Sequence, residues 1–129
     1  MTLSHYADQT AYLTKDGSEI RELMHPATHG NQTQSLAEAR LPAGCQTLAH
    51  RHRRSEELYH VTQGHGWLHR DGQRHWLQAG DTALISPGCV HWLDNPGPDA
   101  LVLLCCCAPA YTHDDTELVA WPTTGAGDV

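Results

Sequence analysis

Residues 44–64 read GCQTLAHRHRRSEELYHVTQG and are the most informative segment of the chain. His50 and His52 lie two positions apart on a predicted strand, so both imidazoles project from the same face and can meet at one point. Arg51, between them, must point to the opposite face. Glu57 follows after a basic turn. Two imidazoles and a carboxylate form a donor set that suits a divalent transition metal.

The carboxylate of this set is either Glu56 or Glu57, because adjacent residues of a strand point to opposite faces. Glu57 shares a face with Tyr59, whereas Glu56 shares the other face with His60. Alternation alone therefore leaves the choice between the two carboxylates open.

A third imidazole comes from residues 80–95, which read GDTALISPGCVHWLDN. His91 opens a further predicted strand, immediately after the turn marked by Pro87 and Gly88. Three imidazoles and one carboxylate are too rich in nitrogen for calcium or magnesium. They suit one divalent transition metal, namely Fe, Mn, Zn, Ni or Cu.

The chain around these segments has the rhythm of an all-β domain. Short alternating or β-branched segments are separated by Gly, Pro and Asp-Gly signals, and Asp71-Gly72 predicts a type I′ hairpin turn. This pattern favours a sandwich or an antiparallel jelly-roll barrel. The predicted strands are 34–41, 46–52, 57–63, 66–70, 73–78, 82–85, 90–94 and 100–107.

We divide the chain into a short N-terminal extension at 1–33, a barrel at 34–118 and a flexible C-terminal tail at 119–129. In the extension, Asp16 and Glu19 have the spacing of a capping box. Apolar residues then follow at helical spacing, so we expect one short helix that stops at Pro26.

Both metal-site segments resemble the two motifs of the cupin superfamily. Residues 44–64 match G-x5-H-x-H-x4-E-x6-G at every fixed position, and this spacing favours Glu57 over Glu56 as the carboxylate. Residues 80–95 match G-x5-P-x-G-x2-H-x3-N except that Ser86 stands in place of the proline. The resemblance is to small single-domain cupins. It implies a jelly-roll barrel with one metal bound by His50, His52, Glu57 and His91, and with two coordination positions left open.

Three further residues are candidates for lining a pocket above the metal. Tyr59 shares a strand face with Glu57, and Trp67 and His69 share a face on the strand that follows. We expect Glu56 to form an exposed ion pair with Arg53 or Arg54.

Composition and charge indicate which classes of partner this protein is expected to bind. Fifteen acidic residues against eight basic ones give a formal charge of −7, so nucleic acid is not an expected partner. No apolar run approaches the ~18 residues of a membrane helix. Five cysteines lack a C-x-x-C pair, and we expect reduced thiols, including the run Cys105, Cys106 and Cys107. We expect a soluble, cytoplasmic homodimer in which a second copy covers an apolar sheet face.

Such a site supports several reactions, so fold and metal do not define one. The resemblance implies a metal-dependent enzyme acting on a small oxygenated organic compound as substrate, with dioxygenase, isomerase, decarboxylase or polyketide-cyclase type chemistry. The ion would bind substrate oxygens and act as a Lewis acid. The alternatives are a non-catalytic cupin that binds or senses a small molecule, and a metal-stabilised scaffold.

Overall fold

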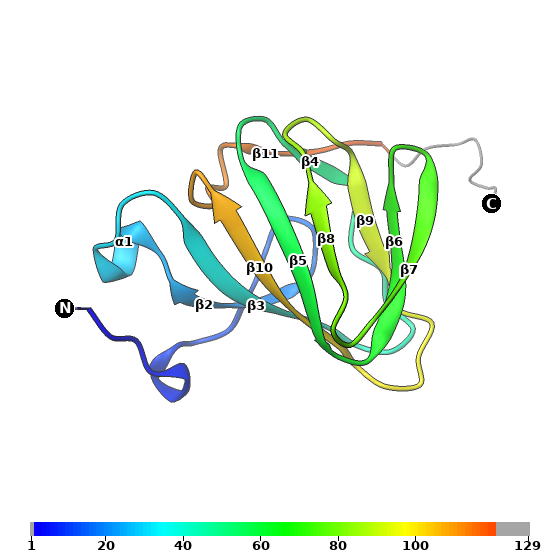
Figure 1. The fold of residues 1–129 in the computed structure, drawn as a ribbon, viewed down its shortest axis with the longest axis horizontal. Helices are drawn as coiled ribbons and strands as arrows, with labels where there is room; N and C mark the ends of the chain where they lie inside the picture. Colours follow the sequence, from blue (N-terminus) through cyan, green and yellow to red (C-terminus); the bar gives the residue numbers. More distant parts are fainter. Residues whose placement is uncertain (1, 121–129) are drawn as a thin grey trace.

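Two antiparallel sheets face each other in the computed structural model, which describes residues 2–120 (Figure 1). One sheet has six strands in the order β1-β2-β3-β10-β5-β8, and the other has five in the order β11-β4-β9-β6-β7. The strands are Tyr12–Leu13 (β1), Glu19–Met24 (β2), Ser35–Leu41 (β3), His50–His52 (β4), Glu56–Gln63 (β5), His65–Arg70 (β6), Gln73–Gln78 (β7), Thr82–Ile85 (β8), His91–Asp94 (β9), Leu101–Ala108 (β10) and Thr116–Leu118 (β11). Short helical turns lie at Tyr6–Asp8 (η1) and Pro26–His29 (α1).

The all-β jelly-roll prediction is confirmed, and the predicted strands lie within one residue of the observed ones with a single exception. The segment predicted at 46–52 forms a strand only at His50–His52, preceded by an isolated bridge between Gln46 and Asp94. Asp71 and Gly72 both have positive φ, as the type I′ turn between β6 and β7 requires.

The helix predicted after Asp16 is wrong. Residues 19–24 form β2, which pairs antiparallel with β3, so this part of the N-terminal segment extends the six-stranded sheet. Asp16-Gly17 is the turn that reverses the chain from β1 into β2, and Gly17 has a φ of 91° there. An Asp-Gly pair is a hairpin signal, and it outweighed the spacing that suggested a helix.

The core lies between the sheets and is built by alternation along the strands. Leu68, Ile85, Leu101, Leu103 and Val61 are almost completely buried. Their strand neighbours on the other face are mostly partly or fully exposed. Burial of each such side chain contributes about 1.5–3 kcal/mol.

Two residues of the expected motifs stabilise the strand connections. A Cβ at Gly64 would clash with the backbone of Ala100, and its φ of 77° also favours glycine. Asn95 is fully buried, and its Nδ2 donates hydrogen bonds to the carbonyl oxygens of Leu41 and Asp99, both at 2.9 Å. Its Oδ1 accepts one from the Gly97 N–H at 2.9 Å, so the side chain closes the turn that follows β9.

Of the tail expected at 119–129, residues 121–129 lie outside the described residues. Within residues 2–120, no helix is long and apolar enough to cross a membrane. All five cysteines are free thiols, and Cys105 and Cys107 are buried.

Candidate metal centre

Three strands bring four donors together between the sheets. His50 and His52 come from β4, Glu57 from β5 and His91 from β9. All four residues are buried, and one ligand atom from each lies within 4.8 Å of the others. The His50–His91 pairing across β4 and β9 places two of the imidazoles side by side, with ring centroids 4.2 Å apart. The sequence-predicted ligand set is thus assembled in one place.

The protonation of His50 and His91 is determined by backbone carbonyl oxygens. Nδ1 of His50 lies 2.8 Å from the Leu48 oxygen, and Nδ1 of His91 lies 2.9 Å from the Cys89 oxygen. A carbonyl oxygen can only accept, so each Nδ1 carries the proton and donates it. Each Nε2 therefore presents a lone pair towards the other ligands.

His52 is held in the same orientation by a hydroxyl group. Its Nδ1 lies 3.0 Å from Thr116 Oγ1, and that hydroxyl donates its own proton to the Thr112 oxygen at 3.0 Å. Because the hydroxyl proton is already used, Thr116 accepts from His52, and the Nε2 lone pair again points inward. Outer partners of this kind orient histidine ligands in metalloproteins.

The inward-facing atoms of the four residues face one another, and one of them has no hydrogen-bond partner among the described residues. Oε1 of Glu57 lies 3.2 Å from His52 Nε2 and 3.4 Å from His91 Nε2. The Nε2 atom of His91 is buried and has no hydrogen-bond partner within residues 2–120. Lone pairs and a carboxylate facing one another are satisfied by a cation between them. The four residues therefore fit a transition metal ion.

The electrostatics also call for positive charge at this point. Burial alone would raise the pKa of Glu57, but the adjacent His52 and His91 dominate and hold that pKa well below its ordinary value. Burial works against the imidazolium form of His52, yet the Glu57 carboxylate overcomes it and raises the pKa of His52. Burial, helped by His91, lowers the pKa of His50. The carboxylate is thus kept ionised, and a metal cation can replace the proton that the site attracts.

The second oxygen of Glu57 is held by a thiol. Cys107 Sγ donates to Oε2 at 3.5 Å from β10, the strand next to β5. Burial, together with the negative charge of Glu57, raises the pKa of Cys107, so the thiol keeps its proton. Cys107 thus leaves Oε1 directed at the histidines.

A cavity of about 50 Å³ adjoins three of the four donors, His50, His52 and Glu57. Tyr59 lines it, as its strand position predicted, and its ring centroid lies 5.8 Å from that of His91. Burial raises the pKa of Tyr59 well above its ordinary value, so the phenol stays protonated. The cavity is lined by Thr14, Asp16, Ser18, Ile20, Glu22, Ser35, Ala37, Ala39, Leu41, Thr47, His50, His52, Glu57, Tyr59, Leu93, Leu103, Cys105, Cys107, Tyr111 and Thr116.

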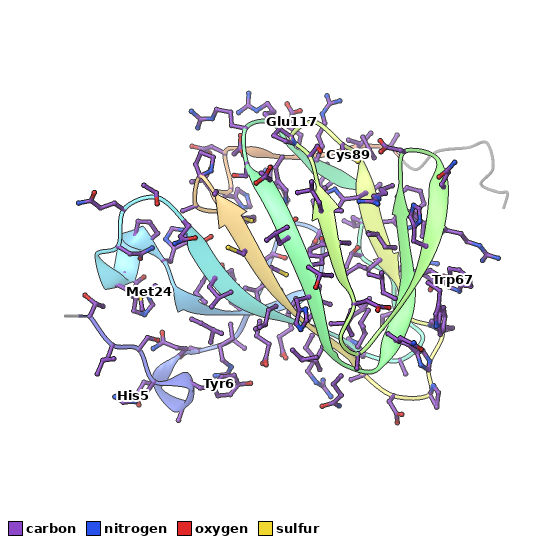
Figure 2. The ribbon with its side chains drawn as sticks, in the orientation of Figure 1. His5, Tyr6, Met24, Trp67, Cys89 and Glu117 are labelled. Carbon is purple, nitrogen blue, oxygen red and sulfur yellow. The ribbon has the colours of Figure 1, made fainter. Side chains whose placement is uncertain are left out.

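Trp67 and His69 do not line this cavity, so the prediction that they form the pocket is wrong. Between them on β6, Leu68 is fully buried and points inward, which sends its two neighbours to the outside. Figure 2 shows Trp67 on the outside of β6 and β7. In the sequence alone, no residue of β6 indicated which of its two faces points inward.

Sequence reasoning missed Asp16 as a site residue. The β1–β2 turn carries it into the cavity, and its Oδ2 lies 3.4 Å from Nε2 of His50. Interpreting residues 16–24 as a helix removed the turn, whereas the Asp16-Gly17 pair carried the signal that would have found it.

Glu56 is exposed, in contrast to Glu57. The predicted ion pair of Glu56 with Arg53 or Arg54 is wrong. The arginines of this turn face the segment around β11 instead, with contacts between Arg51 and Glu117 at 2.8 Å, Arg53 and Glu117 at 3.9 Å, and Arg54 and Asp115 at 3.6 Å.

Comparison with known proteins agrees with this geometry. A family model described as the cupin domain matches residues 37–107, which include all four metal-site donors. The chain belongs to the cupin family.

Three similar proteins differ in how closely they match this chain. An uncharacterised protein of Methanocaldococcus jannaschii is 45% identical over 84% of this chain and 86% of its own length. An oxalate-binding protein of Thermotoga maritima is 28% identical over 67% of this chain and 71% of its own. The structure of a Streptomyces nucleoside dehydratase superposes with a TM-score of 0.73 and 14% identity, covering 90% of this chain and 88% of the other, and it shows the shared fold.

Proposed function

We propose that this cupin is a metal-dependent enzyme that acts on a small oxygenated organic compound. His50, His52, Glu57 and His91 would hold one divalent transition metal, which is Fe, Mn, Zn, Ni or Cu. The observation that carries the proposal is the convergence of three Nε2 lone pairs and one carboxylate oxygen beside a cavity. A closed structural site would have no such space next to its ligands.

A metal ion bound here would supply Lewis acidity and, in the case of iron, reactivity towards dioxygen. The surrounding residues do the remaining work. The apolar side chains of β3 and β10 exclude water from one wall of the cavity. Tyr59 presents a protonated phenol to the cavity, and Cys107 holds the Glu57 carboxylate in position.

Dioxygenase, isomerase, decarboxylase and polyketide-cyclase type reactions all fit this arrangement, because each needs substrate oxygens placed next to a Lewis acid. The Streptomyces neighbour is a dehydratase, which supports the capacity of this fold to host an enzyme. A second candidate is a non-catalytic protein that binds a small molecule. The name of the Thermotoga maritima relative, an oxalate-binding protein, favours it.

Two measurements test the proposal in sequence. Elemental analysis follows reconstitution of the purified protein with each of the five metals in turn, and we expect about one ion per chain. The loaded forms are then screened for oxygen uptake and for substrate consumption with small diketones, enediols, aromatic diols and keto acids. Metal uptake without any turnover would favour the binding protein, and a total metal content far below one per chain would contradict both candidates.

The proposal includes a homodimer. The strand register aligns five side chains across the outer face of the six-stranded sheet, in the order Met24, Leu36, Cys106, Leu58 and Leu84. Leu36, Leu58 and Leu84 are exposed at 36%, 41% and 46%. A continuous apolar row of this kind favours coverage by another protein surface, and a second copy would supply a self-complementary one.

Leu58→Glu, which adds a charge at the centre of this row, tests the homodimer. We expect light scattering to give the mass of two chains for the wild type and of one chain for the variant. An exposed leucine outside the row, Leu118, provides the control as Leu118→Glu. A wild-type mass of one chain at micromolar concentration would contradict the dimer.

The five free thiols support a reducing compartment, so we propose that the protein is cytoplasmic.

A further inference from the structure

Asp16 brings a second carboxylate to the metal centre. Its Oδ1 accepts hydrogen bonds from Thr14 Oγ1 at 2.7 Å and from the N–H and hydroxyl of Ser18 at 2.9 and 2.7 Å. Its Oδ2 faces His50 Nε2 at 3.4 Å. That nitrogen has no proton to donate, because Leu48 holds the proton on Nδ1. Within residues 2–120, Oδ2 therefore faces the cavity without a donor.

The turn that carries Asp16 is fixed in place. The Leu48 N–H donates to the Asp16 carbonyl oxygen at 2.8 Å, which ties the turn to the segment before β4. Lys15 Nζ donates to the carbonyl oxygens of His113 at 3.1 Å and Thr116 at 2.8 Å, which ties it to the other side of the site. Asp16 is consequently a positioned part of the cavity wall.

Glu22 supplies another oxygen without a donor. Every second residue from Thr14 to Glu22 lines the cavity, as expected for a hairpin and strand with one inward face. The Tyr12 hydroxyl donates to Glu22 Oε2 at 3.0 Å, whereas Oε1 is buried and has no hydrogen-bond partner among the described residues. Buried oxygens of this kind are costly unless a ligand or water donates to them.

The charge of the lining is one-sided. Its carboxyl groups are those of Asp16, Glu22 and Glu57, and neither lysine nor arginine is among the lining residues. Among the atoms that are buried without a hydrogen-bond partner within residues 2–120, Glu22 Oε1 belongs to this lining, whereas His91 Nε2 belongs to the metal site. A divalent ion would balance the charge of Glu57, whereas no lysine or arginine of the lining neutralises the carboxyl groups of Asp16 and Glu22.

We infer that the cavity selects an uncharged substrate bearing hydroxyl groups and disfavours a dianion such as oxalate, with Asp16 Oδ2 accepting a hydrogen bond from a substrate hydroxyl beside the metal centre. The inference rests on the proposed function, because it takes the ion as bound by the four donors. A substrate hydroxyl can donate a hydrogen bond to a carboxylate oxygen that has no other donor. A carboxylate of the substrate would instead be repelled by that oxygen. The charge of the lining therefore contributes to specificity.

Binding of two ligands with the same number of non-hydrogen atoms tests this inference. Dihydroxyacetone is uncharged and carries two hydroxyls, and oxalate is a dianion. Each is titrated calorimetrically into the zinc-loaded wild type, Asp16→Asn and Asp114→Asn. Asparagine retains an oxygen for the three hydrogen bonds at Oδ1, so the turn should persist. Asp114 is exposed and lies outside the cavity lining, so its variant removes the same charge elsewhere.

We expect Asp16→Asn to weaken dihydroxyacetone binding by about tenfold and to strengthen oxalate binding by about tenfold. Asp114→Asn should change both by no more than about twofold. Zinc content is measured first, and a wild type that takes up no metal would refute the proposed function instead. With zinc bound, three results overturn the inference: no dihydroxyacetone binding to the wild type, a shift of both affinities in the same direction, or no shift in either.

Discussion

Histidines occur on both faces of the five-stranded sheet, and only those on the inner face form a site. His50 and His91 are buried, with Nδ1 bound to a backbone oxygen and Nε2 directed at the other donors. On the outer face, His69 stacks on Trp92 with ring centroids 4.5 Å apart and planes 5° from parallel. His65 packs against Trp76 at 4.7 Å. The same residue type thus supplies candidate metal ligands inside and packing groups outside.

Two histidine–threonine pairs make the contrast sharper. Inside, His52 Nδ1 lies 3.0 Å from Thr116 Oγ1, and outside, His60 Nδ1 lies 2.8 Å from Thr82 Oγ1. The hydrogen bonds are alike, but His52 is buried with its other nitrogen facing Glu57, whereas Thr82 is exposed to water. Convergence on an enclosed point, rather than the hydrogen bond alone, distinguishes a ligand.

The largest effect should follow removal of an inner imidazole. We expect His91→Ala to lower metal affinity by more than about 100-fold, because the remaining donors lose both a ligand and the shape of the site. Elemental analysis after dialysis against a weak chelator measures the loss. His69→Ala, the matched change on the outer face, should keep about one ion per chain. Equal metal content in the two variants would contradict the assignment of the inner face.

A smaller effect is expected from the adjacent carboxylates. Glu57→Gln keeps the size of the side chain but removes the anionic ligand, and we expect metal affinity to fall by about ten- to a hundredfold. Glu56→Gln alters the exposed neighbour and should leave affinity unchanged. Competition with a chromophoric chelator gives both values. If Glu56→Gln were the variant that lost metal, β5 would have the opposite facing, and Tyr59 would leave the cavity with Glu57.

The two threonines allow a finer test of the outer partner. Thr116→Val removes the acceptor that orients His52 while keeping the side-chain shape, so metal affinity should fall by about tenfold. Thr82→Val removes the hydroxyl that bonds to His60 Nδ1 and should have no effect on the metal. The same chelator competition applies. An unchanged affinity in Thr116→Val would mean that packing alone orients the His52 ring.

The sequence predicted the convergence of the four candidate donors well because strand parity and turn spacing determine where they point. His50 and His52 share a parity, and the turn at Pro87 and Gly88 leads directly into His91. The same rule could not orient β6, where Trp67 and His69 alternate with Leu68 and Arg70, and no charge pattern decided which pair faced inward. In the structure, the complete burial of Leu68 shows that Trp67 and His69 face outward.

The contribution of the N-terminal segment was harder to predict because its signals were local and conflicting. Ile20, Leu23 and Met24 fit a helical period, yet residues 19–24 gain more by pairing with β3 at the edge of a sheet. Propensity over a few residues yields to such tertiary pairing. The helix prediction also prevented Asp16 from being identified as a site residue, because its position at the metal centre depends on long-range contacts of the turn.

The smallest expected effect concerns His69 and the pH dependence of stability. Burial lowers the pKa of His69, and the nearby Asp94 offsets only part of this effect. In the unfolded chain the imidazole has a pKa of about 6.5, so the unfolded state binds the proton more readily. Stability linked to this group is therefore present above that value and is lost as the pH falls through it.

His69→Gln removes the titration while retaining a polar side chain against Trp92. Between about pH 7.5 and 5.5, the wild type should lose slightly more stability than the variant, by less than ~0.5 kcal/mol because the ring is partly exposed to solvent. Scanning calorimetry of the zinc-loaded proteins would register this as a difference of about 1–2 °C in the change of Tm. Metal content should be the same in both, since His69 does not face the inner donors. A variant that lost more stability than the wild type on acidification would show that the folded protein favours the charged imidazole, which would contradict the apolar packing role of the outer histidine.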